Sequence, residues 1–187
     1  MTPAILAHAY EFASHAHRDQ RRRGNKEPYI NHPLRVARTV AERKAGVEVI
    51  IAAVLHDVVE DTAVPIGEIV MLFGQRVGDL VQELTDPPSI ENLPRKVRKR
   101  LQAEKFASAS AGARMVKMAD QIDNLESLLE SLGTRKREDA ISYATCALDV
   151  VEACAEADPV LATRARRVHD DILASLEEEP EPEPALA

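Results

Sequence analysis

The stretch AAVLHDVVEDT, residues 52–62, joins the end of an apolar run to a dense group of charges. The helical repeat of 3.6 residues places His56 one turn before Glu60, and Asp57 one turn before Asp61. Carboxylates crowded at the end of a buried segment repel one another and lose hydration, which is unfavourable without a cation. The stretch therefore predicts a buried helix that ends at a metal site. The alternative is a solvated helix end at which acids happen to gather.

Apolar residues recur at helical spacing along almost the whole chain. Ala, Val and Leu dominate, aromatic residues make up only 3% and Trp is absent, which suits close-packed helices better than a β-sandwich. We find no internal repeat and no convincing strand, so the predicted fold is all-α, with about eight to ten helices. The expected helices cover residues 3–19, 32–44, 47–62, 65–74, 75–85, 94–106, 113–132, 136–155 and 159–176.

The length of 187 residues suits one domain with a proper core. We expect this domain to cover residues 1–176 and a disordered Glu/Pro-rich tail to cover residues 177–187. The net charge is −7, and the five Glu of the tail leave only −2 on the domain. A domain so near neutrality has no strong field for nucleic acid or an anionic membrane, so neither is expected as a partner.

The compartment is expected to be the cytoplasm. The N-terminus shows no basic region followed by an apolar one, and no apolar run approaches the roughly 20 residues that span a bilayer. Cys146 and Cys154 are eight residues apart on one expected helix, which is too far for a disulfide within it. They are interpreted as unpaired cysteines of a reducing compartment. The sequence makes no prediction about oligomeric state.

Two further segments carry residues that a metal site needs. His32 stands where a loop turns into a helix, although a lone His is more often structural. Asp120 lies in an otherwise apolar helical stripe with Asn124 one turn later, and its alternative role is a salt bridge with Lys117. Two His and two Asp would form a mixed nitrogen and oxygen site for a borderline or hard divalent ion. Mn²⁺ fits such a site, and Zn²⁺ and Fe²⁺ remain open.

Taken together, these blocks resemble the HD-domain hydrolases of the RelA/SpoT alarmone family, and most closely its single-domain small alarmone hydrolases. The similarity covers about residues 7–143. Ordered blocks at family-like separations are more specific than an isolated His-Asp pair. The resemblance implies an HD-domain helical bundle. The segments that carry it are His17–Arg23, Pro28–Pro33, His56–Asp61, Arg98–Leu101 and Lys117–Asn124.

The resemblance also implies roles for individual residues. Glu60 and Asp61 match the acidic pair that orients and deprotonates the attacking water. Metal ligands are matched by His32, His56, Asp57 and Asp120, with Mn²⁺ the usual ion. Substrate contacts are matched by Arg22 and Arg23 for phosphates, Asn124 for the nucleoside, and Tyr143 near the phosphates.

The activity implied by the resemblance is Mn²⁺-dependent hydrolysis of the 3′-pyrophosphate of ppGpp or pppGpp, giving GDP or GTP and pyrophosphate. One alternative is the same machinery acting on adenine alarmones or NADPH. Another is a catalytically silent module that binds nucleotide, although binding alone does not require the water-activating pair Glu60 and Asp61.

The block Lys117–Asn124 departs from the family pattern at two positions. The family commonly has a basic residue after the Asp and a His or Tyr before the Asn, where this chain has Gln121 and Asp123. Asp123 adds a carboxylate near the expected nucleotide pocket. It is expected either to face solvent or to alter ligand choice.

Overall fold

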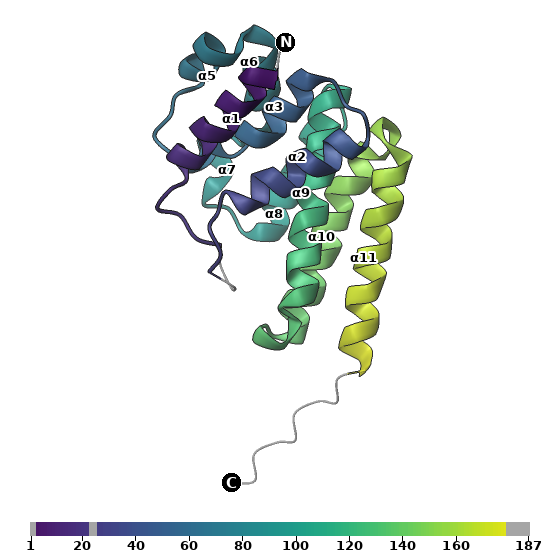
Figure 1. Cartoon of the computed structure of the whole chain (residues 1–187). Helices are drawn as coiled ribbons and strands as arrows, with labels where there is room; N and C mark the ends of the chain where they lie inside the picture. The colour runs from purple at the N-terminus through teal and green to yellow at the C-terminus, as the bar shows by residue number, and fades with distance from the viewer. Residues whose placement is uncertain (1–2, 23–25, 179–187) are drawn as a thin grey trace.

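The structure, a computed structural model, describes residues 3–22 and 26–178 (Figure 1). Over these residues the predicted all-α bundle is confirmed. Nine helices have eight residues or more, two have four, and the described residues contain an isolated β-bridge between Arg21 and Pro28 but no strand. The helices are α1 (Pro3–Ala16), α2 (Asn31–Glu42), α3 (Val47–Leu55), α4 (Val58–Asp61), α5 (Ile66–Phe73), α6 (Gln75–Leu84), α7 (Pro88–Glu91), α8 (Arg95–Phe106), α9 (Ala111–Glu130), α10 (Arg137–Cys154) and α11 (Pro159–Glu178).

Helix α9 is the centre of the bundle, packed against α2, α3, α6, α10 and α11 (Figure 1). Its residues Val116, Met118 and Leu125 are fully buried, and each such side chain contributes roughly 1.5–3 kcal/mol relative to exposure. Because neighbours surround α9, four polar residues near its middle are buried as well: Lys117, Asp120, Gln121 and Asp123. Buried polar groups require partners, so these residues determine the chemistry of the interior.

The apolar run forms α3, but the expected helix over residues 47–62 is divided. A turn at His56 and Asp57 separates α3 from the short α4, so the prediction of one continuous helix was wrong at this point. The His56 ring provides a physical reason. Its Nδ1 lies 2.8 Å from the carbonyl oxygen of Ala53, which is the acceptor for the Asp57 N–H in an uninterrupted helix. The Asp61 N–H still donates to the Asp57 carbonyl at 2.8 Å, so the one-turn spacing survives.

The segment between α1 and α2 is folded back on itself. The Arg22 N–H donates to the Glu27 carbonyl at 2.9 Å, and the Tyr29 N–H donates to the Gln20 carbonyl at 3.1 Å. These bonds and the β-bridge bring the two sides of the segment together. The loop thereby holds Arg22 and Tyr29 near the ends of α3 and α9 rather than leaving them in solvent.

Helix α11 begins at a buried acid. The Asp158 Oδ1 accepts hydrogen bonds from the Val160 and Leu161 N–H groups, which satisfies two donors of the first turn. The helix continues to Glu178, two residues into the expected tail, and residues 179–187 lie outside the described residues. In the described part of the chain, no helix combines the length and apolar character needed to cross a membrane. Cys146 and Cys154 are both buried and unpaired, as expected.

Candidate metal centre and active site

Three segments bring the four expected metal ligands together. His32 comes from the first turn of α2, His56 and Asp57 from the turn after α3, and Asp120 from the middle of α9. The His32 Nε2 lies 3.5 Å from Asp57 Oδ2 and 3.3 Å from Asp120 Oδ1. The His56 Nε2 lies 3.2 Å from Asp57 Oδ2. The ligand atoms of His32, His56 and Asp57 all fall within 4.8 Å of one another, a spacing at which one ion can be held.

Both imidazoles are oriented with Nε2 toward this cluster, because Nδ1 is occupied elsewhere. The His32 Nδ1 lies 2.7 Å from Asp123 Oδ2, and the His56 Nδ1 lies 2.8 Å from the Ala53 carbonyl oxygen. A carbonyl only accepts, so in the neutral ring of His56 the hydrogen stands on Nδ1 and Nε2 keeps its lone pair. That buried Nε2 makes no hydrogen bond with any described residue, and the Asp57 oxygen 3.2 Å away is itself an acceptor, so two lone pairs face each other unless a proton or a cation lies between them. The donor set therefore fits a divalent cation.

Asp120 makes the salt bridge with Lys117 that the sequence allowed, with 2.9 Å between Nζ and Oδ2, and the remaining charges of the cluster balance through protons or through a cation. Burial disfavours protonation of His56, but the neighbouring Asp57 carboxylate outweighs it and raises the pKa of His56 to about 9. Burial likewise opposes ionisation of Asp57, yet His56 and His32 lower its pKa. Burial opposes protonation of His32, but the hydrogen bonds that its protonated ring donates to Asp120 and Asp123 outweigh it and raise the pKa of His32. A cation in the cluster would replace these protons, as metal binding to His ligands does in general.

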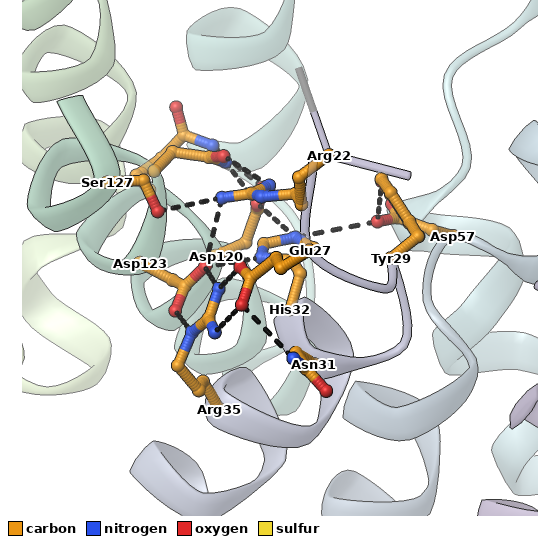
Figure 2. A network of polar contacts seen from close by, with 12 residues as sticks. Arg22, Glu27, Tyr29, Asn31, His32, Arg35, Asp57, Asp120, Asp123 and Ser127 are labelled. Atoms are coloured by element: carbon orange, nitrogen blue, oxygen red, sulfur yellow. Dashed lines mark hydrogen bonds and ion pairs between the residues drawn. The ribbon is translucent and has the colours of Figure 1, made fainter. Parts of the chain in front are cut away.

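Tyr29 supports the cluster directly. Its hydroxyl donates to Asp57 Oδ2 at 2.7 Å (Figure 2). Its ring packs against His17, with 5.0 Å between ring centroids. Burial, then Asp57, raises the pKa of Tyr29, which keeps the phenol neutral and able to donate. The sequence suggested only that Tyr29 packs the loop onto the core. Its position three residues before His32 was the available signal for a role in the site.

Glu60 and Asp61 lie on α4, at the edge of the cluster. The Glu60 Oε2 accepts from the Asp86 N–H at 3.0 Å, and the Asp61 carbonyl accepts from the Gln20 side chain at 2.7 Å. Both carboxylates reach solvent on one side. Partial burial raises the pKa of Glu60, and burial with the nearby Asp57 charge raises the pKa of Asp61. A raised pKa makes a carboxylate a better proton acceptor near neutral pH.

Arg22 crosses from the loop to α9. Its guanidinium donates to Asn124 Oδ1 at 3.1 Å, to Ser127 Oγ at 3.0 Å and to Asp123 Oδ2 at 3.2 Å (Figure 2). Two of the expected substrate-binding residues, Arg22 and Asn124, are therefore in direct contact. Arg23, another expected substrate-binding residue, lies outside the described residues.

Tyr143, on α10, lies between two arginines. The Arg95 guanidinium carbon is 5.4 Å from the ring centroid and that of Arg135 is 5.7 Å. Burial, followed by the Asp120 charge, raises the pKa of Tyr143. The basic run 95–100 is not simply a solvated helix face. Arg95 stacks on Tyr143, and the Lys99 ammonium donates to Gln121 Oε1 at 2.7 Å.

The two departures from the family pattern are both engaged with the cluster. Gln121 donates to Asp120 Oδ2 at 2.7 Å. Asp123 is only 5% exposed and contacts His32, so the expectation that it faces solvent was wrong. The solvent-facing alternative failed because α9 is covered on several sides. Asp123 follows Asp120 by three residues and so lies on the same face of the helix, and this spacing was the signal that linked Asp123 to the site.

Comparisons with known proteins agree with this geometry. A family model described as HD domain matches residues 9–150. The mouse and human proteins named guanosine-3′,5′-bis(diphosphate) 3′-pyrophosphohydrolase MESH1 are each 43% identical over 128 residues, which cover 67% of this chain and 70% of theirs. The Escherichia coli bifunctional (p)ppGpp synthase/hydrolase SpoT is 36% identical over 129 residues, which are 18% of its length.

Solved structures show the same arrangement of the chain. A metazoan orthologue of SpoT, described as hydrolysing ppGpp, superposes with a TM-score of 0.83 at 32% identity, covering 91% of this chain and 96% of the other. A Listeria monocytogenes protein superposes with a TM-score of 0.65 at 28% identity, covering 78% and 98%. These matches confirm the resemblance carried by the sequence blocks, and the chain belongs to the HD-domain family.

Proposed function

We propose that this chain hydrolyses the 3′-pyrophosphate of ppGpp and pppGpp, releasing pyrophosphate and GDP or GTP in an Mn²⁺-dependent reaction. The observation that carries the proposal is the convergence of two imidazole Nε2 atoms and the carboxylates of Asp57 and Asp120 beside the pair Glu60 and Asp61. The names of the MESH1 relatives support the choice of a guanosine substrate and of the bond that is cleaved.

The proposed cation ligands are His32, His56, Asp57 and Asp120. A divalent cation held there supplies Lewis-acid stabilisation of phosphoryl oxygens and lowers the pKa of water in its contact. Mixed imidazole and carboxylate donors suit Mn²⁺, which is the ion we propose. Tyr29 keeps Asp57 in place through its 2.7 Å hydrogen bond, because the neutral phenol donates to the carboxylate.

Glu60 is proposed as the base that accepts a proton from the attacking water, with Asp61 holding that water. The Asp86 N–H holds one oxygen of Glu60 at 3.0 Å, leaving the other available to water. The raised pKa of Glu60 favours proton acceptance in the transition state. This function separates a hydrolase from a module that only binds nucleotide, since binding needs no proton acceptor.

Arg22 is proposed to stabilise the negative charge of the phosphates, together with Arg23. Its guanidinium is already held at the edge of the cluster by Asn124, Ser127 and Asp123, and bonds to phosphate oxygens pair two opposite charges, which the bonds to Asn124 and Ser127 do not. Asn124 is proposed to contact the nucleoside. The neutral phenol of Tyr143 is proposed as a donor near the phosphates. The enzyme is placed in the cytoplasm, where the free Cys146 and Cys154 would remain reduced.

In the direct test, the protein is stripped of metal with EDTA and reloaded with Mn²⁺. It is then incubated with ppGpp, and the products are separated by ion exchange. GDP and pyrophosphate in equal amounts, formed only with the metal, are the expected result. The same assay offers ppApp and NADPH as substrates, so that preference is measured in one preparation. Faster turnover of either would assign the site to that nucleotide, and binding of ppGpp without turnover by any of them would reduce the protein to a binding module.

A further inference from the structure

Asp123 is a buried carboxylate with both oxygens in use. It lies on α9 one turn after Asp120, and its Oδ2 is 2.7 Å from His32 Nδ1. The same oxygen accepts from Arg22 at 3.2 Å, and Arg35 donates to both carboxylate oxygens. Such a carboxylate is acceptor-only when ionised, so the atom of His32 that it contacts carries a hydrogen.

The contact falls on the side of the His32 ring that faces away from the cluster. Nε2, the other ring nitrogen, lies 3.3 Å from Asp120 Oδ1 and 3.5 Å from Asp57 Oδ2. Asp123 therefore stands behind the ring and is not placed as a further ligand. A hydrogen on Nδ1 leaves the Nε2 lone pair directed at the cluster. The Ala53 carbonyl has the equivalent position behind His56.

Arg35, which pairs with Asp123, is itself held by a second ion pair. The Arg35 guanidinium, on α2, also binds Glu27 in the preceding loop, with Nη2 to Oε1 at 2.8 Å and Nη1 to Oε2 at 3.2 Å (Figure 2). Glu27 accepts in turn from the Asn31 side chain at 3.1 Å. The chain Glu27–Arg35–Asp123–His32 thus connects the loop, α2 and α9 behind one imidazole. Arg35 fixes the carboxylate geometry because its planar donors bind two carboxylates at once.

We infer that Asp123 is a positioning residue for the metal centre, which sets the tautomer and orientation of His32, and that Arg35 and Glu27 hold Asp123 in place. Carboxylates behind metal-binding histidines act in this way in other proteins and raise the basicity of the ring. The inference rests on the proposed metal site but not on the identity of the substrate. It gives the departure from the family pattern at this position a role in cation affinity rather than in ligand choice.

The test measures Mn²⁺ affinity of the full chain, stripped of metal, by titration calorimetry and by the electron paramagnetic resonance signal of free Mn²⁺. Asp123→Ala is expected to weaken binding about 10–100-fold, the range for loss of a partner behind a metal-binding His. Asp123→Asn keeps an acceptor oxygen and is expected to fall between the wild type and Asp123→Ala. Arg35→Met, which loosens Asp123 but leaves it in place, is expected to have the smallest effect of the three.

Ser127→Ala is the matched control. It removes another partner of Arg22 but no contact of His32, so its Mn²⁺ affinity is expected to equal that of the wild type. Nitrogen NMR of labelled histidine, at a pH at which the His32 ring is neutral, provides an independent reading. The single ring hydrogen is expected on Nδ1 in the wild type and distributed between the two nitrogens in Asp123→Ala. Should Asp123→Ala fail to fold, the Asp123→Asn protein decides by the same two measurements.

Wild-type affinity and an unchanged His32 tautomer in a folded Asp123 variant would overturn the inference and leave the metal site standing. A wild-type protein that binds no Mn²⁺ would refute the metal site itself. Metal binding that weakens as expected in the variants, in a protein that does not hydrolyse ppGpp, would support the role of Asp123 and refute only the proposed function.

Discussion

Two buried groups of charge in this molecule are arranged very differently. At the start of α11, Asp158 is saturated: Oδ1 accepts from the N–H groups of Val160 and Leu161, and Oδ2 accepts from Arg43 Nε at 2.8 Å. One negative charge meets one positive charge, and the structure needs nothing more there.

The cluster at the start of α2, the end of α3 and the middle of α9 is arranged the other way. Asp120 is paired with Lys117, but Asp57 and Asp120 both approach the same nitrogen of His32, and the buried His56 Nε2 makes no hydrogen bond with any described residue. Buried polar groups are normally satisfied, and a crowded set that is not satisfied indicates a ligand. Burial of an acid is therefore not by itself evidence for function, whereas incomplete pairing of a buried group is such evidence.

The largest effect is expected from Asp57→Ala, which removes the carboxylate shared by both imidazoles. Mn²⁺ binding should be lost and turnover should fall at least about 1,000-fold, more than the loss of a supporting residue causes. Calorimetric titration and the ppGpp assay measure the two effects. Turnover within tenfold of the wild type (a difference of about 1.4 kcal/mol) would show that the cluster is not the catalytic centre.

Glu60→Gln should separate binding from chemistry. The amide keeps the size of the side chain but cannot accept the proton, so kcat should fall about 10²–10⁴-fold while Mn²⁺ affinity stays unchanged. Steady-state kinetics at saturating Mn²⁺ measure the first quantity and calorimetry the second. A parent-like kcat would remove Glu60 from the role of base.

Adding Mn²⁺ should stabilise the folded protein through the cluster. At a free concentration about 100 times its Kd, a ligand that binds only the native state contributes about 2.7 kcal/mol to the free energy of unfolding. Urea unfolding with Mn²⁺ or with EDTA measures this difference. The Asp57→Ala protein serves as the control, and an equal gain in it would assign the stabilisation to sites elsewhere.

The smallest effect is expected from Asp158→Ala, in the saturated group. Loss of the cap and of the Arg43 bond should lower the free energy of unfolding by about 1–2 kcal/mol, with kcat and Mn²⁺ affinity unchanged. Chemical denaturation and the ppGpp assay on the folded protein test both halves of this statement. Weakened metal binding in this variant would show that the Asp158 group and the metal cluster are energetically coupled.

The pH dependence of that stabilising effect has a defined sign. Burial opposes ionisation of Asp158, but the Arg43 bond and the helix N–H groups outweigh it and lower the pKa. The contribution is therefore complete above the unfolded pKa of about 3.9 and disappears as the pH falls through the lower folded value. The gap in stability between wild type and Asp158→Ala should be constant from about pH 7 to 5 and narrow below about pH 4. A gap that widens on acidification would contradict the pairing with Arg43.

Local pattern was enough to predict much of this molecule. Apolar residues at helical spacing identified the long helices, because that period reflects which face of a segment is buried. The HD blocks indicated the family, which the matches confirm, and named His32, His56, Asp57 and Asp120 as a set. These inferences need only residue types and spacings, so they do not depend on the details of packing.

Pairings between distant segments were decided by the tertiary structure alone. Asp123 and His32 are 91 positions apart, and Tyr29 and Asp57 are 28 apart, so no helical or strand period relates them. The break at His56 depends on where one ring nitrogen finds its acceptor. Hydrogen bonds require atoms within about 3 Å, a condition that a one-dimensional pattern does not encode. The sequence alone therefore predicted the metal ligands as a set, and only the folded chain decided which other residues hold them in place.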